Sequence, residues 1–247
     1  MGILSLLLWT PVVGILVLSF TSGTDTRSIR FIANLFATLA FLVSCWLIII
    51  YDQQDSAIQF SEQFTLNPKL GSALALGVDG LSIPMLVLAA LLTSVAMLAS
   101  FTISHGVKSF HICILLLEFG MLGVFLAQDW AMFYIFWELT LIPLFFLIDR
   151  WGGKRRHTAS LNFVLYTMGG SIFMLISLLA IGHYMPAHGG SLMPSMTEAA
   201  RSMPRDEQVW VLLGPTGPFG LYLHLLRGRG RMGQDPPGLD IDQGHLY

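Results

Sequence analysis

Long apolar runs alternate with short polar segments along most of this chain. Each run is close to the roughly 20 residues that a helix needs to cross the hydrocarbon core of a bilayer. The runs cover residues 3–20, 31–51, 81–101, 107–127, 130–148 and 159–184. The pattern predicts an all-α polytopic transmembrane helix bundle with six spans, and a partial seventh span beginning near residues 210–213.

The connections between these runs differ in length. Gln128 and Asp129 form nearly the whole link between the fourth and fifth runs, so those two helices are expected to be antiparallel neighbours. The segment 52–79 is much longer, and residues 59–66 within it partly alternate between apolar and polar positions. That alternation predicts a small β-hairpin lying on the membrane surface.

Composition supports a membrane protein. Of 247 residues, 54% are hydrophobic and only 11% are charged, and the mean hydropathy is +0.69. Cys45 and Cys113 both fall inside apolar runs, which argues against a disulfide framework or a metal site. No basic patch indicates nucleic acid, and no glycine-rich fingerprint indicates a bound cofactor.

Positive residues are concentrated in alternate connections. One side of the predicted membrane topology carries Arg27, Arg30, Lys108, Arg150, Lys154, Arg155 and Arg156. The positive-inside rule therefore places the loop 150–156 in the cytoplasm. The N-terminus is then expected on the lumenal or periplasmic side.

Two carboxylates interrupt the apolar runs. Glu138 lies midway along the fifth run and Glu118 lies in the fourth, both about ten residues from the connection at Gln128 and Asp129. An ionisable group at that depth costs a few kcal/mol and usually has a function. We predict that Glu138 handles protons, with Glu118 as a second candidate; the alternative is a neutral packing role for either. If both face the bundle interior, they would interact with each other.

Other polar groups in the spans are secondary candidates. His111 precedes Glu118 by two turns and would extend a proton relay towards one surface. Asn162 and Tyr166 are expected to offer hydrogen bonds to a neighbouring helix or to waters, and Gly169 with Gly170 to permit close packing. Pro143 cannot donate to the carbonyl of Leu139, which predicts a kink beside Glu138.

Several motifs carry a resemblance to a known family. They are F-W-E-L-T-L-I-P at 136–143, W-G-G-K-R-R at 151–156, N-F-V-L-Y-T-x-x-G-S at 162–171, G-V-D-G-L-S at 77–82 and L-E-F-G-M-L-G-V-F-L-A-x-D at 117–129. This set resembles the chain 4 family of proton-pumping NAD(P)H:quinone oxidoreductases, in its cyanobacterial and chloroplast form. The match covers roughly residues 1–213, the N-terminal portion of an antiporter-like subunit.

The resemblance implies proton translocation coupled to electron transfer to a quinone such as plastoquinone. In that family the counterpart of Glu138 is essential and pairs with a lysine on a seventh helix, and Glu118 matches an acidic position on helix four. NAD(P)H, flavin, iron–sulfur centres and the quinone site are expected in partner subunits, and the membrane is a thylakoid or bacterial inner membrane. A membrane-arm fragment without transport and a stand-alone cation/proton antiporter are the alternatives.

The end of the sequence departs from the family pattern. Residues 214–247 are rich in glycine, proline and arginine, with no apolar run beyond Leu226. Such a composition favours disorder. We interpret residues 1–213 as a partial transmembrane domain followed by a frame-shifted or early-terminated ending, with a naturally shortened paralogue as the alternative.

Overall fold

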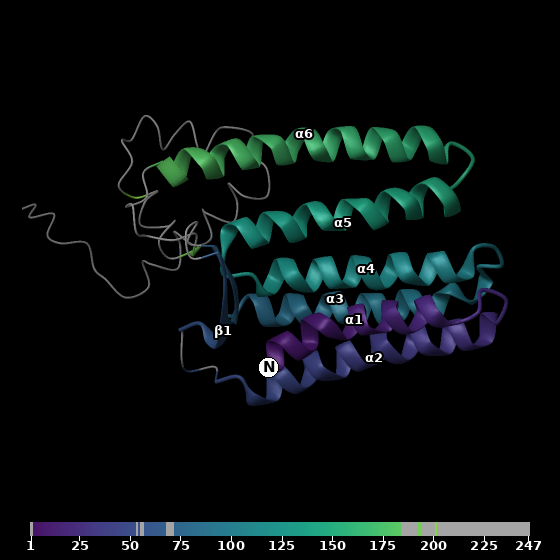
Figure 1. Ribbon diagram of the computed structural model, residues 1–247, viewed down its shortest axis with the longest axis horizontal. Helices are drawn as coiled ribbons and strands as arrows, with labels where there is room; N and C mark the ends of the chain where they lie inside the picture. The colour runs from purple at the N-terminus through teal and green to yellow at the C-terminus, as the bar shows by residue number, and fades with distance from the viewer. Residues whose placement is uncertain are drawn as a thin grey trace, which may run out of the picture.

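Six long helices lie nearly parallel to one another in the computed structural model (Figure 1). The structure describes residues 2–52, 54, 57–67, 72–183, 192, 193 and 201. Its elements are α1 (Ile3–Phe20), α2 (Thr26–Ile50), β1 (Gln59–Asn67), β2 (Ser72–Val78), α3 (Ser82–Ala99), the 3-10 turn η1 (Ser100–Thr102), α4 (Val107–Leu126), α5 (Trp130–Trp151) and α6 (Arg156–His183). All six helices are long and apolar enough to cross a membrane, which confirms the six predicted spans. The expected seventh span and residues 214–247 lie outside the described residues.

The helices form a layered arrangement with two distinct ends. Helix α4 packs against α1, α2 and α3 on one side and α5 on the other, while α6 packs on the outer side of α5 (Figure 1). We call the end carrying β1 and β2 the hairpin end. The opposite end, where α5 turns into α6 through Lys154 and Arg155, is the basic end. The antiparallel pairing of α4 and α5 agrees with the prediction.

Two helices begin earlier than their apolar runs. The Asp25 carboxylate accepts a hydrogen bond from the Ser28 backbone N–H at 3.1 Å, so it caps α2 and the helix includes the polar residues from Thr26 onwards. Hydrogen bonding from Ser28 lowers the pKa of this exposed carboxyl. Helix α6 likewise begins at Arg156, inside the basic connection. Polar first turns lie outside the hydropathy pattern, which explains the difference.

The predicted hairpin is present, and it also anchors the first helix. Strands β1 and β2 pair antiparallel at the end of the bundle. The Glu62 carboxylate on β1 accepts hydrogen bonds from the backbone N–H groups of Gly2 (3.2 Å), Leu4 (2.9 Å) and Ser5 (3.3 Å), and from the Ser5 hydroxyl. A negative charge there satisfies unpaired donors and complements the helix dipole. The hairpin therefore provides the N-terminal cap of α1.

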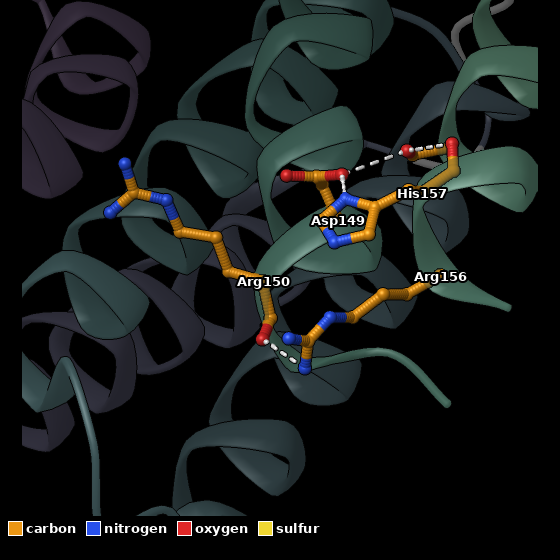
Figure 2. A network of polar contacts seen from close by, with 5 residues as sticks. Asp149, Arg150, Arg156 and His157 are labelled. Carbon is orange, nitrogen blue, oxygen red and sulfur yellow. Dashed lines mark hydrogen bonds and ion pairs between the residues drawn. The ribbon is translucent and has the colours of Figure 1, made fainter. Parts of the chain in front are cut away.

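At the basic end, polar contacts close the turn between α5 and α6 (Figure 2). The Nδ1 atom of His157 lies 2.6 Å from a carboxylate oxygen of Asp149, and the Ser160 hydroxyl donates to the same oxygen at 3.2 Å. Arg156 donates through Nη1 to the Arg150 carbonyl at 3.3 Å. These contacts join the last turn of α5 to the first turns of α6.

Glycines allow α4 and α5 to approach closely. A Cβ atom at Gly120 would lie 2.7 Å from Cγ2 of Thr140, and one at Gly123 would overlap the Phe136 ring. Gly169 and Gly170 were expected to allow such packing, but a Cβ atom at either would meet no described atom within 4 Å. Neither glycine makes a close contact within the described chain, because α6 is the outermost of the six helices, so this stays a prediction.

Candidate functional site

Glu138 lies in the middle of α5 and faces a groove between α5 and α6. It is eight residues from the first residue of α5, Trp130, or about 12 Å along the helix axis. The groove has a volume of about 770 Å³ and its other lining residues are mainly aliphatic and aromatic. They are Tyr134, Ile135, Leu139, Leu141, Ile142, Phe145, Leu161, Val164, Leu165 and Met168. Among these described lining residues, Glu138 is the only carboxylate.

Two hydroxyl groups accompany Glu138 at this interface. The Tyr134 side chain, one turn earlier on α5, lies close to Glu138 and to Ser171 of α6. Ser171 is buried, and its hydroxyl also donates to the Met168 carbonyl at 3.1 Å. Oε1 of Glu138 is buried and has no hydrogen-bond partner among the described residues. Tyr134 was not predicted from the sequence, although its spacing of four residues from Glu138 places both side chains on one helix face.

The opposite face of α5 holds the helix against α4. Phe136 packs edge-on against Phe119 of α4, with ring centroids 5.4 Å apart. Phe136 and Thr140, whose side chains meet Gly123 and Gly120, lie about 160–200° around α5 from Glu138 at 3.6 residues per turn. Packing of these residues against α4 therefore directs Glu138 towards α6.

Glu118 occupies the other side of α4. Its side chain is fully buried, and neither carboxylate oxygen has a hydrogen-bond partner in the part of the chain that the structure describes. Phe119, Gly120 and Gly123, which meet α5, lie about 100–200° around α4 from Glu118. Glu118 shares its face with the buried residues Leu115 and Leu122, and points towards α1, α2 and α3.

The two glutamates thus share a depth but not a site. Glu118 is eight residues before the end of α4 and Glu138 is eight residues after the start of α5, so both lie about 12 Å from the hairpin end of their helices. The expected equal depth is confirmed. The condition for their interaction, that both face one interior, is not met, because the α4–α5 contact separates the side chains.

His111 lies on the same face of α4 as Glu118, closer to the basic end. Its side chain is fully buried; Nδ1 lies 2.7 Å from the Val107 carbonyl and Nε2 lies 3.3 Å from the Ser100 hydroxyl. The structure therefore places His111 and Glu118 on one buried stripe, about 10 Å apart along the axis.

Tyr166 and Asn162 do not join either glutamate. Both side chains are exposed on α6, with Tyr166 82% exposed. Within the described residues neither has a hydrogen-bond partner. Tyr166 lies roughly opposite the groove-lining residues Val164 and Met168 on the helix circumference. The expected contacts to a neighbouring helix are therefore absent from the described chain, because α6 turns this face outwards.

The asymmetry between the two glutamates decides what each can do. Glu138 is partly buried, borders an open groove and lies close to the Tyr134 hydroxyl, so a second charged or polar group can reach it from the groove. Glu118 is fully buried where α4 packs against α1, α2 and α3. Proton exchange at Glu118 therefore requires a polar route through the bundle itself.

Comparison with known proteins finds this chain similar to NAD(P)H-quinone oxidoreductase chain 4. Residues 127–203 match the family described as NADH:quinone oxidoreductase/Mrp antiporter, transmembrane. The chain is 38% identical over 181 residues to NAD(P)H-quinone oxidoreductase chain 4 of Synechococcus sp. (strain WH7803), covering 72% of this chain and 33% of that protein. It is 31% identical over 214 residues to chain 4 3 of Picosynechococcus sp. (strain ATCC 27264 / PCC 7002 / PR-6), covering 86% of this chain and 38% of that protein. The chain thus spans between a third and two fifths of the length of these relatives.

Solved structures show the same architecture. A chain of respiratory complex I from Thermus thermophilus with bound NADH superposes with a TM-score of 0.73 at 27% identity, covering 85% of this chain and 42% of that one. A chain of the archaeal membrane-bound sulfane sulfur reductase superposes with a TM-score of 0.67 at 19% identity, over 84% of this chain and 32% of that one. The second likeness concerns the fold alone.

Proposed function

We propose that this chain, which resembles NAD(P)H-quinone oxidoreductase chain 4 and has the fold of an antiporter-like membrane subunit of complex I, takes part in proton translocation driven by electron transfer to a quinone. It would do so as one membrane-arm subunit of a larger oxidoreductase. NAD(P)H oxidation, the iron–sulfur centres and the plastoquinone or other quinone site would belong to partner subunits.

The observation that carries this proposal is the position of Glu138. Its carboxyl group lies near the middle of a transmembrane helix, and one of its oxygens is buried without a partner in the described chain. Carboxylates in such surroundings are retained at substrate and ion pathways. Among the described residues that line the groove, Glu138 is the carboxyl group that can accept and release a proton.

Tyr134 and Ser171 would position this carboxyl group. Both hydroxyls can donate a hydrogen bond to a carboxylate and accept one from a protonated acid. They can therefore stabilise either protonation state of Glu138 without binding the proton themselves. A positive charge approaching through the groove would favour the ionised form, and its withdrawal would favour the protonated form. The resemblance implies a lysine on a further helix in that role.

The orientation in the membrane is part of the proposal. Arg27 in the first turn of α2, Lys108 in the first turn of α4 and Lys154 in the connection between α5 and α6 all lie at the basic end of the bundle. By the positive-inside rule this end faces the cytoplasm, and the hairpin end faces the periplasm or thylakoid lumen.

The test is Glu138→Gln in the assembled complex, with Ile142→Leu as a control for the same face of the groove. Glutamine keeps the size and hydrogen bonding of the side chain but cannot release a proton. We expect electron transfer to continue in an assembled complex while the number of protons moved per electron falls. A normal proton-to-electron ratio would contradict the proposal.

Two further outcomes separate the alternatives. If Glu138→Gln prevents assembly and Ile142→Leu does not, Glu138 has a structural role and the chain is a scaffold of the membrane arm. If the isolated chain in vesicles exchanges cations for protons without any partner subunit, it is a stand-alone antiporter.

A further inference from the structure

We propose that a hydrated polar passage connects the basic end of the bundle to Glu118, between α2, α3 and α4, and that Arg30, Asn34 and His111 line it. The assignment of this passage to proton movement rests on the proposed function. The existence of the passage as a path for water does not depend on the proposed function and can be tested separately.

The outer part of the passage is a polar cluster one turn inside the bundle. Arg30 and His111 are each four residues from the first residue of their helices, or about 6 Å deep. Arg30 donates through Nη2 to the Ile103 carbonyl, immediately after η1, at 2.9 Å. His111 in turn contacts the Ser100 hydroxyl. Helices α2 and α4 thus direct polar groups towards the same turn, η1.

The next polar groups lie one turn deeper. Asn34 donates through Nδ2 to the Arg30 carbonyl at 2.8 Å, while its Oδ1 and the Nε of Arg30 are buried without partners among the described residues. Ser94 of α3 is at a similar depth, and its buried hydroxyl donates to the Ala37 carbonyl of α2 at 3.1 Å. Polar atoms therefore continue along the contact between α2 and α3.

Glu118 is the inner end of this series. It is eleven residues from the start of α4, about 16 Å from the basic end, and its two buried oxygens have no partner in the described chain. The large majority of buried side-chain polar atoms are hydrogen-bonded to protein or to ordered water. Unpaired atoms on Arg30, Asn34 and Glu118, at increasing depth on facing helices, are therefore best explained by bridging waters.

The passage opens in one direction only. Beyond Glu118 the same face of α4 continues with Leu122 and Leu126, both fully buried in the larger apolar core. That core also includes Leu4, Leu7, Leu86 and Leu47 from the other three helices. Towards the basic end, Leu115 lies between His111 and Glu118 on α4, so water must pass along Asn34 and Ser94. Glu118 is thus accessible from the basic end and sealed from the hairpin end.

The experiment uses a cysteine at the inner end of the passage as a reporter. In membrane vesicles that contain the whole complex, Cys45 and Cys113 are replaced by alanine and Glu118→Cys is introduced. Silver ions, which follow water through narrow paths, are added from one side, and the remaining thiols are counted with a maleimide after denaturation. Leu115→Cys is the matched control, because Leu115 is equally buried one turn away but apolar.

We expect Glu118→Cys to react about tenfold faster than Leu115→Cys from the basic end, because the control reacts only through local opening of the bundle. Adding Asn34→Leu should slow the silver reaction of Glu118→Cys to nearly the rate of Leu115→Cys. Adding Leu35→Phe, on the exposed face of α2, should leave the faster rate unchanged. Equal rates for the two cysteines, or faster reaction from the hairpin end, would overturn the passage.

A second reporter covers variants that do not assemble. Asn34→Cys is compared with Ala33→Cys, which is at the same depth on α2 but packed in the apolar core. Faster silver reaction at position 34 supports the passage, and equal rates reject it. Neither silver-reaction measurement requires proton pumping. A normal proton-to-electron ratio in Glu138→Gln would therefore reject the proposed function without affecting the evidence for the passage.

Discussion

Glu118 and Glu138 lie at the same depth in the bundle but on opposite sides of the contact between α4 and α5. The contact is made by Gly120 and Gly123 of α4 against Thr140 and Phe136 of α5. Each glutamate lies roughly half a helical turn away from it. One carboxylate therefore faces the closed four-helix core and the other faces the groove beside α6, which makes them two separate sites.

This separation predicts that the two glutamates act independently. We expect the change in free energy of unfolding for the double variant Glu118→Gln/Glu138→Gln to equal the sum of the single changes within about 0.5 kcal/mol, as for distant sites without shared partners. Unfolding of the four proteins in detergent micelles measures this difference. A larger coupling energy would mean that the carboxylates interact across the helix contact.

The close contact of α4 and α5 predicts opposite effects for two glycine substitutions. Gly123→Ala would place a methyl group into the Phe136 ring, and we expect it to destabilise the bundle by about 1–3 kcal/mol. Gly169→Ala is the control, because a methyl group there meets no described atom and alanine favours helices by up to about 1 kcal/mol. Thermal unfolding of both variants tests the prediction, which fails if Gly123→Ala is as stable as Gly169→Ala.

The cap on α1 predicts a role for Glu62 in joining the hairpin to the bundle. Glu62→Ala leaves the N–H groups of Gly2, Leu4 and Ser5 without their acceptor. We expect a loss of about 0.5–2 kcal/mol, the range for removing an N-terminal cap. Faster hydrogen exchange in the first turn of α1 would locate the effect. Gln63→Ala, on the exposed side of the same strand, should change neither quantity.

The positions of the loops predict which residues can be labelled from each side of the membrane. In sealed vesicles, a cysteine at Lys154 should react with a membrane-impermeant maleimide only from the cytoplasmic side. A cysteine at Gln63, in the hairpin, should react only from the other side. The reverse pattern would show that the charged loops do not determine the orientation of this chain.

Hydropathy by itself was sufficient to locate the helices. A span of about 20 apolar residues has to become a helix in a membrane, because only a helix or a closed barrel satisfies its backbone groups there. The six spans, the antiparallel α4–α5 pair and the hairpin followed from local sequence. The same reasoning identified Glu138 and Glu118, since a carboxylate in an apolar run is visible without any structure.

The tertiary structure decided which way each of these groups points. The face of a helix that contacts a neighbour depends on where small residues permit close approach, and Gly120 and Gly123 turned out to do this while Gly169 and Gly170 did not. The close contact at Gly120 and Gly123 directs Glu118 towards α1, α2 and α3 and directs Glu138 towards α6. It also places Tyr134, rather than Tyr166, beside Glu138. Likewise, the cap that Glu62 provides to α1 joins residues nearly 60 positions apart. Periodicity along one segment does not specify such contacts, because they depend on how separate segments pack together.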